Sequence, residues 1–315
     1  MTKHVEPSAV EDDQTDLNGI VEELRGLRKS SQQRRYGGGP PPELPSRQAI
    51  ASIVDGLVAS LYPRHFAPAE LTLDSVDGFI AFTLDAAFRS LREQVRRELQ
   101  LHADSADPAN SEHDPRAGEI TRAFARGLPK VRATLDVDIR AAFDGDPAAR
   151  SLDEVIFCYP GISTLIRHRL AHQLYVLGAP MLARIIAELA HAQTGIDIHP
   201  GAEIDEGFFI DHGTGVVIGE TARLGKRVRL YQAVTLGAKR FEADETGALV
   251  KGKPRHPILE DDVVVYAGAT ILGRITIGQG SSIGGNVWLT HSVPPNSNIT
   301  QAKARLETFH DGGGI

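Results

Sequence analysis

The sequence predicts an α+β protein in which an N-terminal α-helical domain is followed by a parallel β-solenoid with one long loop. Between residues 46 and 193, apolar side chains recur every three or four positions, the period of an amphipathic helix. From residue 194 to about 295, aliphatic side chains recur every six positions, a period typical of repeat proteins built from short strands. Residues 237–257 interrupt this second pattern.

The two ends of the chain differ from these domains. Residues 1–45 are polar and end in YGGGPPPELP, a flexible glycine run followed by a stiff proline run, so we predict a disordered extension there. Within it, DLNGIVEELRGLRKSSQQRRY has the composition of one short helix. Residues 296–315 follow the last repeat and form a predicted C-terminal tail.

Several local signals divide residues 46–193 into helices. AIASIVDGLVASLYP has apolar residues at helical spacing and ends at Pro63, and VDGFIAFTLDAAFRSLREQVRRELQLH is a second long helix. A further helical stretch is expected to break near Gly127–Pro129. SLDE, residues 151–154, matches a capping box. Gly178 and Gly195 are predicted helix stops.

Three aliphatic runs define the solenoid. The longest has Leu259, Val265, Ile271, Ile277, Ile283 and Leu289, the second has Ile218, Leu224, Leu230 and Leu236, and the third has Ile198, Ile204 and Ile210. The third run is offset from the second by two residues. Each six-residue unit is expected to form a short strand and a corner, with the aliphatic side chain pointing inward onto its equivalent one coil away. The interruption, residues 237–257, is predicted to leave the solenoid as a loop that ends in Arg255–His256.

The composition argues against several classes of protein. A formal net charge of −7 argues against a nucleic-acid binder. No apolar run reaches the ~18–20 residues that a membrane span needs, and the N-terminal stretch has no apolar signal core. The single cysteine, Cys158, cannot form an intrachain disulfide, and we expect it to be a packing residue. We therefore predict a cytoplasmic protein.

Four motifs carry a resemblance to a known family. DIHPGAEI, DHGTGVVIGETA, AVTLG and RHP occur in this order after a helical domain. This set closely resembles the serine O-acetyltransferases, which are hexapeptide-repeat acyltransferases, over about residues 141–295. The resemblance implies a left-handed β-helix with three flat sides and transfer of acetyl from acetyl-CoA to the hydroxyl of L-serine on the route to cysteine. The left hand comes from the resemblance alone, since parallel crossovers are normally right-handed.

The resemblance implies a general base with an orienting carboxylate. A serine hydroxyl is a poor nucleophile near neutral pH and needs a base at hydrogen-bond distance, a task that neutral histidine suits. By resemblance His212 is this base, and Asp197 fixes its tautomer. The two residues are fifteen positions apart, close to one predicted solenoid turn, which would stack them on one side.

The remaining predicted site residues bind the two charged ends of serine. Arg255 can pair with the carboxylate through two hydrogen bonds. Asp211 can take the ammonium group, together with Asp146 of the motif GDPAAR. By resemblance His256 contacts the substrate as a second histidine, and Glu220 supports these groups.

Acetyl-CoA is the implied co-substrate, without a tightly bound cofactor or a metal. A groove between neighbouring solenoids would hold its pantetheine arm against the small residues Gly237, Ala238, Ala267 and Gly268. Basic residues of the loop, Lys239, Arg240, Lys251 and Lys253, are candidates for its phosphates. Because the single thiol is far in sequence from this site, we expect direct transfer rather than an acyl-cysteine intermediate.

The resemblance also implies partners. Enzymes of this family form homotrimers or dimers of trimers, and L-cysteine is their usual feedback inhibitor. Many end in an isoleucine on a flexible tail that enters the active site of O-acetylserine sulfhydrylase. This chain ends in DGGGI, so Ile315 is the implied anchor for that enzyme.

Three other functions compete with this prediction. The same fold could acetylate a hydroxyl of a sugar or a xenobiotic, although such enzymes usually lack the large helical domain. A metal site like that of β-helical carbonic anhydrases needs three histidines, and His212 and His256 have no clear third ligand. A non-catalytic scaffold would give no reason for Asp197, His212 and His256 to occur together.

Overall fold

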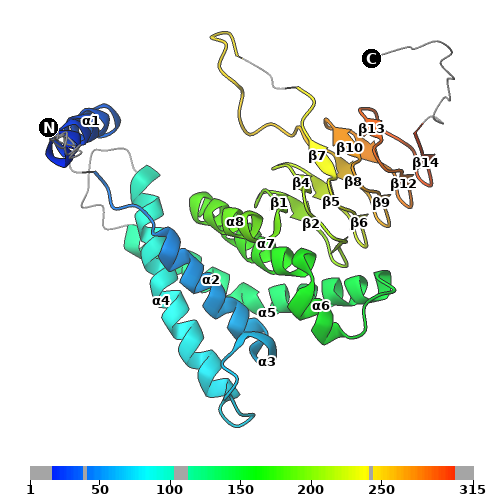
Figure 1. Cartoon of the computed structure of the whole chain (residues 1–315), viewed down its shortest axis with the longest axis horizontal. Coiled ribbons are helices and arrows are strands. Elements are labelled where there is room, and N and C mark those ends of the chain that lie inside the picture. The colour runs from blue at the N-terminus through cyan, green and yellow to red at the C-terminus, as the bar shows by residue number, and fades with distance from the viewer. Residues whose placement is uncertain (1–15, 38–40, 103–112, 241–243, 302–315) are drawn as a thin grey trace, which may run out of the picture.

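The computed structural model of the chain describes residues 16–37, 41–102, 113–240 and 244–301. Helices come first along the chain and short parallel strands follow, in the order that the sequence predicts (Figure 1). None of the helices within the described residues is long and apolar enough to cross a membrane.

Helices occupy the described chain up to Thr194. They are α1 (Leu17–Tyr36), α2 (Arg47–Leu61), α3 (Pro63–Phe66), α4 (Val76–His102), α5 (His113–Gly145), α6 (Leu152–Cys158), α7 (Pro160–Leu177) and α8 (Pro180–Thr194). The predicted helix ahead of the glycine run is therefore present as α1, while residues 1–15 of the predicted extension lie outside the described residues.

Most of the predicted helix ends are confirmed. α2 stops at Leu61, two residues before Pro63, and both Gly178 and Gly195 are left-handed C-caps. Ser151 caps α6 by accepting a hydrogen bond from the Glu154 amide at 3.0 Å. The capping box differs in one detail, because the Glu154 carboxylate accepts from the amide of residue 150 rather than from that of Ser151.

The predicted break near Gly127–Pro129 is wrong, because α5 continues through both residues. A proline inside a helix costs roughly 3 kcal/mol, and tertiary packing on both sides of it offsets that cost. Phe124 and Leu135 are fully buried on either side of the proline. In addition, Gln173 Nε2 of α7 donates to the Phe124 carbonyl at 3.1 Å.

The strands form three parallel sheets, and up to β13 each sheet takes every third strand; β14 then joins the sheet of β12. Sheet A is β1 (Asp197–Ile198), β4 (Val217–Ile218), β7 (Thr235–Gly237), β10 (Thr270–Leu272) and β13 (Trp288–Leu289). Sheet B is β2 (Glu203–Ile204), β5 (Arg223–Leu224), β8 (Ile258–Leu259) and β11 (Thr276–Ile277). Sheet C is β3 (Phe209–Ile210), β6 (Arg229–Leu230), β9 (Val264–Val265), β12 (Ser282–Ile283) and β14 (Asn298–Ile299). The chain therefore passes through the three sheets in turn.

The second residue of each strand faces the interior, as the period of six predicts. Residues such as Leu236, Val265, Ile271 and Ile283 are fully buried. Their strand partners are the inward residues of the next coil, so the aliphatic side chains stack from coil to coil. This stack is the hydrophobic core of the strand region.

The first coil is longer than the second. Asp197 pairs with Val217, twenty positions away, whereas Val217 pairs with Thr235, eighteen positions away. The two extra residues lie in the corner between β3 and β4 and explain the offset between the run that begins at Ile198 and the run that begins at Ile218. The predicted loop also appears, since the described residues between Gly237 and Ile258 contain no strand and project away from the sheets (Figure 1).

A buried ion pair joins the helices to the first coil. Asp138 of α5 is fully buried and accepts from Arg169 of α7, with Nε at 2.6 Å. One Asp138 oxygen also accepts from the amides of Gly207 and Phe208. Arg169 in turn donates to the carbonyls of Ile204 and residue 205. These bonds fix the segment that leads into β3 and the following corner.

Candidate active site

Apart from Asp197, the predicted catalytic and serine-binding residues fall into two groups at different corners of the strand region. The His212 corner, between β3 and β4, contains Asp211 and His212 and lies against Asp146. The His256 corner, between β4 and β5, contains Glu220 and receives Arg255 and His256 from the end of the long loop. Within one copy of the chain, no hydrogen bond or ion pair between described residues joins the two groups.

His212 is displayed on the surface by an unusual backbone conformation. Its φ is +58°, in the left-handed region that non-glycine residues rarely adopt. It lies in the corner that carries the two extra residues, and its side chain is 72% exposed. Nε2 of His212 lies 3.9 Å from Oδ1 of Asp211. An accessible imidazole beside a carboxylate can accept a proton from a bound hydroxyl.

Arg229 of β6 holds the neighbouring Asp211. Its Nη2 donates to Asp211 Oδ2 at 2.8 Å, and the Asp211 side chain is only 14% exposed. The guanidinium carbon lies 4.9 Å from the ring centre of Phe209 and 4.7 Å from that of Tyr231. Ring contacts and the ion pair therefore fix Arg229, and Arg229 fixes one oxygen of Asp211.

Asp146 reaches the same corner from the loop after α5. Oδ2 accepts a hydrogen bond of 2.5 Å from the Tyr159 hydroxyl, and Oδ1 accepts from the Ala148 amide at 2.8 Å. The hydrogen bond from Tyr159 is the largest cause of a lowered pKa for Asp146, and the nearby Arg229 and His212 lower it further. Asp146 is therefore an anion, suited to a cationic ligand group.

Asp197 does not contact His212 in this structure. No hydrogen bond or ion pair between the two appears among the described residues, and the coil around Asp197 has twenty residues, so the expected stacking at a spacing of fifteen is wrong. Asp197 instead lies beside α8, where its carboxylate and ligand atoms of Glu188 and His191 are within 4.8 Å of one another. Its role as the orienting carboxylate stays a prediction.

At the His256 corner, Glu220 anchors Arg255. Arg255 Nη2 lies 2.6 Å from Glu220 Oε2, and the Tyr175 hydroxyl donates to Oε1 at 3.0 Å. Burial acts to raise the pKa of Glu220, but the hydrogen bonds from Arg255 and Tyr175 outweigh it and the pKa is lowered. The guanidinium is thus held by an ionised carboxylate, and the supporting role of Glu220 in the reaction stays a prediction.

His256 is buried and its tautomer is determined by Thr221. The Thr221 amide donates to His256 Nδ1 at 3.0 Å, so Nδ1 is the unprotonated nitrogen and Nε2 carries the hydrogen of the neutral ring. Burial, with a further contribution from Arg255, lowers the pKa of His256 to about 4. The ring lies so close to Gly219 that an added Cβ there would be 2.0 Å from His256 Cδ2. His256 can therefore donate a hydrogen bond but cannot act as a base through Nδ1.

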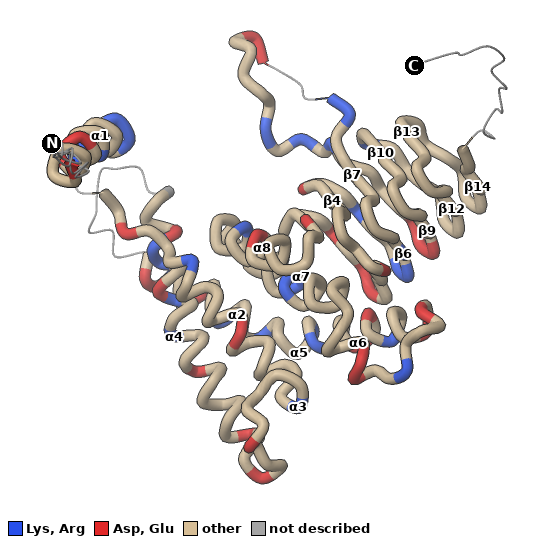
Figure 2. The backbone as a smooth tube through the Cα atoms, viewed as in Figure 1, with Lys and Arg blue, Asp and Glu red and all other residues tan. Residues whose placement is uncertain are grey.

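The small residues predicted for coenzyme A also divide between two corners. Gly237 and Ala238 lie at the end of β7, where the long loop begins, whereas Ala267 and Gly268 precede β10 on the side of the His212 corner. Gly268 has φ +72°, and a Cβ there would meet the Asn286 side chain at 2.2 Å. Basic residues lie on both arms of the loop (Figure 2).

Sequence reasoning missed the residues that hold the site together. Tyr159, Tyr175, Thr221 and Arg229 all position predicted site residues. Thr221 stands within the motif DHGTGVVIGETA but was assigned no role, and the other three lie outside the four motifs. The expectation for Cys158 is wrong, since this residue is exposed at the end of α6, next to Tyr159. Ile315 lies outside the described residues.

Comparisons with known proteins agree on one family. No family model matches the chain. The protein named serine acetyltransferase, plasmid, of Synechococcus elongatus is 59% identical over 278 residues, which cover 86% of each chain. Serine acetyltransferase 1 of Entamoeba histolytica in complex with L-cysteine is 33% identical, with a TM-score of 0.69 over 90% of this chain and 97% of that one. A serine acetyltransferase of Brucella abortus in complex with coenzyme A is 27% identical, with a TM-score of 0.53 over 80% of this chain and 94% of that one. The chain therefore belongs to the serine acetyltransferase family.

Proposed function

We propose that the protein transfers the acetyl group of acetyl-CoA to the hydroxyl of L-serine, giving O-acetylserine and free CoA. The observation that carries the proposal is the pairing of an exposed His212 and two anions at one corner with Arg255 and a neutral His256 at the other. These groups are complementary to the hydroxyl, the ammonium and the carboxylate of serine. Thiol release from acetyl-CoA with L-serine, compared with sugar and xenobiotic hydroxyl acceptors, tests it. A sugar or xenobiotic acceptor turned over faster than L-serine would replace it with the alternative O-acetyltransferase.

In the proposed mechanism His212 removes the proton from the serine hydroxyl as its oxygen attacks the thioester carbonyl. The tetrahedral intermediate then collapses, the carbon–sulfur bond breaks, and the CoA thiolate takes the proton back from the imidazolium. A carboxylate stabilises the imidazolium. The resemblance assigns this role to Asp197, whereas in the structure Asp211 is the carboxylate beside the ring, with Oδ1 3.9 Å from His212 Nε2. Transfer is direct, so ping-pong kinetics would contradict this mechanism.

The two charged ends of serine bind at different corners. Arg255, held by Glu220, takes the carboxylate, and the Nε2–H group of His256 donates a second hydrogen bond to the substrate. Asp146 and Asp211 take the ammonium group. Both carboxylates are pre-oriented, Asp146 by Tyr159 and Asp211 by Arg229, so little ordering is needed when serine binds.

The separation of the corners supports a homotrimer with sites between copies. Sheet A lies between the two corners, and its outward face carries Val217 and Trp288, which are 38% and 70% exposed. A threefold axis along this face would bury these side chains and bring the His212 corner of one copy to the His256 corner of the next. A dimer of such trimers remains compatible with this arrangement.

Mixed assemblies test the shared site. His212→Ala and His256→Ala homo-oligomers should each be nearly inactive, whereas co-expression should restore activity, because some interfaces then combine two intact corners. For random trimers about a quarter of the interfaces would be intact. Mixed trimers without restored activity would place the whole site in one copy.

We further propose that acetyl-CoA binds along the same interface of a left-handed β-helix. The neighbour from Brucella abortus, in complex with coenzyme A, supports this assignment. Gly237–Ala238 of one copy and Ala267–Gly268 of the next would line the pantetheine arm, with loop cations near the phosphates. Gly237→Val should then raise KM for acetyl-CoA and leave KM for serine nearly unchanged. Equal changes in both would contradict it.

L-Cysteine should inhibit by occupying the serine site. It shares the ammonium and the carboxylate of serine and carries a thiol in place of the hydroxyl. The neighbour from Entamoeba histolytica, in complex with L-cysteine, supports this proposal. Inhibition should be competitive with serine and weaker in an Asp146→Ala variant. Inhibition that serine cannot overcome would argue for a different site.

The C-terminal isoleucine is the proposed contact with O-acetylserine sulfhydrylase. A free α-carboxylate can mimic that of the amino-acid substrate, and burial of the isoleucine side chain adds ~1.5–3 kcal/mol. Deletion of Ile315 should abolish binding to the sulfhydrylase from the same cell without changing acetyltransferase activity. Undiminished complex formation by the truncated enzyme would disprove the contact.

A further inference from the structure

The loop between β7 and β8 has to return Arg255 and His256 to a defined place in the His256 corner. Every described residue from 244 to 254 except Val250 is exposed, and none belongs to a strand. A segment with so few buried contacts imposes little order on its last residues. The positions of Arg255 and His256 therefore depend on what holds the chain where the loop ends.

Three residues at that point occupy the same place in successive coils. Thr221, His256 and Arg274 lie three positions before the inward residues of β5, β8 and β11, and these strands pair in that order in sheet B. Thr221 contacts the end of the loop, since its hydroxyl oxygen accepts from the amides of Arg255 and His256 at 2.8 and 3.1 Å. Arg274 stands one coil beyond His256, on the side away from Thr221.

A single nitrogen of Arg274 connects the other two residues. Nη1 donates to the Thr221 carbonyl at 2.6 Å and to the His256 carbonyl at 3.0 Å. This nitrogen carries two hydrogens, so each carbonyl can receive one. Neighbouring coils are about 4.8 Å apart, so the side chain reaches back across two spacings, about 9.6 Å, toward the coil of Thr221. Only a long side chain can span this distance.

Successive coils are joined differently at the two ends of sheet B. At the end toward sheet C, the Gly280 amide donates to the Asp261 carbonyl at 2.9 Å, so the backbone itself links one coil to the next. At the end toward sheet A, no backbone amide of the described residues donates to the carbonyl of Thr221 or of His256. Backbone carbonyls need hydrogen-bond partners, and at this end the guanidinium of Arg274 supplies them.

We propose that Arg274 is a positioning residue for the candidate active site. It fixes the backbone on both sides of the point where the loop ends, and so holds the guanidinium of Arg255 and the imidazole of His256 in place for serine. Arg274 acts through the backbone and needs no contact with the substrate. The expected effect on serine rests on the proposed acetyl transfer, whereas the expected effect on the loop does not.

Hydrogen exchange of the full chain, followed by mass spectrometry, measures the effect on the loop. Arg274→Met keeps the aliphatic part of the side chain and removes both donors. The amides of Arg255 and His256 should then exchange roughly tenfold faster than in the wild type, because the end of the loop is no longer tied to the coils on either side. Equal protection of these amides in the two proteins would overturn the proposal.

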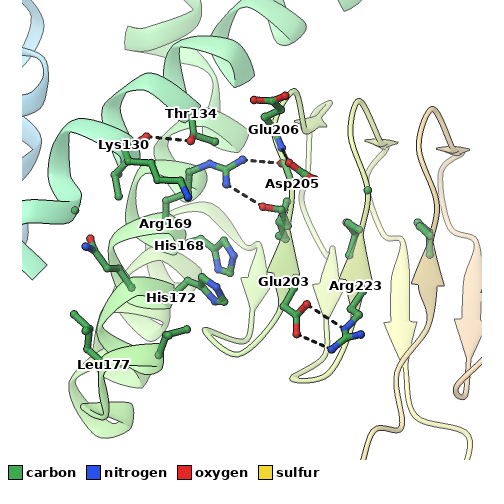
Figure 3. Close-up of a pocket in the computed structure, with 18 of the residues that line it drawn as sticks. Lys130, Thr134, His168, Arg169, His172, Leu177, Glu203, Asp205, Glu206 and Arg223 are labelled. Carbon is green, nitrogen blue, oxygen red and sulfur yellow. Dashed lines mark hydrogen bonds and ion pairs between the residues drawn. The ribbon is translucent and has the colours of Figure 1, made fainter. Parts of the chain in front are cut away.

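Arg223→Met is the matched control. Arg223 lies in the same coil as Thr221 and pairs with Glu203 at 3.1 Å, beside a cavity of about 750 Å³ between the helices and sheet B (Figure 3). This pair is exposed, so its loss should leave the exchange of both loop amides unchanged. Equally fast exchange in the two methionine variants would mean that Arg274 has no specific role, and would overturn the proposal.

Steady-state kinetics test the link to serine. Arg274→Met should raise KM for serine roughly tenfold, with smaller changes in KM for acetyl-CoA and in Tm, because Arg274 is exposed. Arg274→Lys keeps the charge but has a shorter side chain without the fork of donors, so its KM for serine should also rise. Wild-type behaviour of the lysine variant, or faster exchange without a change in KM for serine, would overturn the proposal. If the wild type does not acetylate serine, the proposed function fails, and the exchange result still decides whether Arg274 holds the loop.

Discussion

The backbone amide of Thr221 donates a hydrogen bond of 3.0 Å to Nδ1 of His256, and this bond makes His256 a hydrogen-bond donor in the candidate site. The threonine hydroxyl oxygen accepts from the amides of Arg255 and His256, so Thr221 holds both residues at once. The His212 side chain, by contrast, is 72% exposed, and none of the described residues makes such a hydrogen bond to its ring. We therefore expect His256 to donate a hydrogen bond to the substrate and His212 to act as the base.

Gly219→Ala tests whether the placement of His256 matters. The new methyl group would lie 2.0 Å from Cδ2 of His256, so the imidazole must move away from its hydrogen bond with Thr221. We expect KM for serine to rise and kcat/KM to fall roughly tenfold or more. Gly78→Ala, in the first turn of α4 where nothing lies within 4 Å of an added Cβ, is the matched control and should leave both unchanged.

His212→Ala should affect the chemical step instead. Removal of a positioned general base lowers kcat by roughly 10²–10⁴, while KM for serine should change little because the charged ends of serine bind elsewhere. Asp197→Asn should have a smaller effect on kcat. Steady-state kinetics on the folded oligomer measure both, and near-normal turnover by His212→Ala would show that another group is the base.

The low pKa of His256 also predicts how stability depends on pH. Its value of about 4 in the folded protein lies below the ordinary value of 6.5, so between these pH values the unfolded chain binds more protons. Stability should therefore rise with pH from about 4 to 6.5, and this residue contributes at most about 3 kcal/mol of the change. Denaturant unfolding at pH 4.5 and 7.5 measures it. His256→Asn should reduce the difference, and an identical difference in the variant would contradict the assignment.

Arg229→Gln tests the positioning of Asp211. The change removes an ion pair of 2.8 Å with a carboxylate that is 14% exposed, so Asp211 should turn away from the ammonium of serine. KM for serine should rise roughly tenfold, with a smaller change in KM for acetyl-CoA. Arg227→Gln breaks the exposed pair with Asp262 and is the control, expected to alter neither. Equal changes in both KM values would indicate a general disturbance instead.

The sequence predicted the parts of this structure that repeat or that use a local rule. The six-residue period predicted the strands and their inward-facing residues, and glycines predicted the C-terminal ends of α7 and α8. These features could be predicted because each depends on a few neighbouring residues. The break at Pro129 was predicted wrongly because packing of Phe124 and Leu135 overrides a local penalty. The contacts of Tyr159 and Arg229 could not be predicted, since they join segments that only the fold brings together.

The site prediction failed in one further way that has the same origin. A spacing of fifteen between Asp197 and His212 was equated with one coil, yet the coil has twenty residues because the corner that carries His212 is itself enlarged. A regular repeat specifies the scaffold, whereas His212, the proposed base, stands where the repeat is broken. The six-residue period therefore indicated where the corner lies along the chain, but not which side chains contact one another there.

The buried pair of Asp138 and Arg169 should determine whether that corner keeps its shape. Arg169→Met leaves the fully buried Asp138 carboxylate without its cation, a change that typically costs about 3–5 kcal/mol. The double change Asp138→Leu and Arg169→Met should cost clearly less than the sum of the single changes, because no unpaired charge remains. Glu203→Gln, in an exposed pair on sheet B, should cost less than about 1 kcal/mol and serves as the control. Denaturant unfolding of the wild type and of the four variants, including Asp138→Leu alone, measures these costs. Additive costs in the double variant would mean that the two residues act independently, and the helices would then not fix the approach to His212 through this pair.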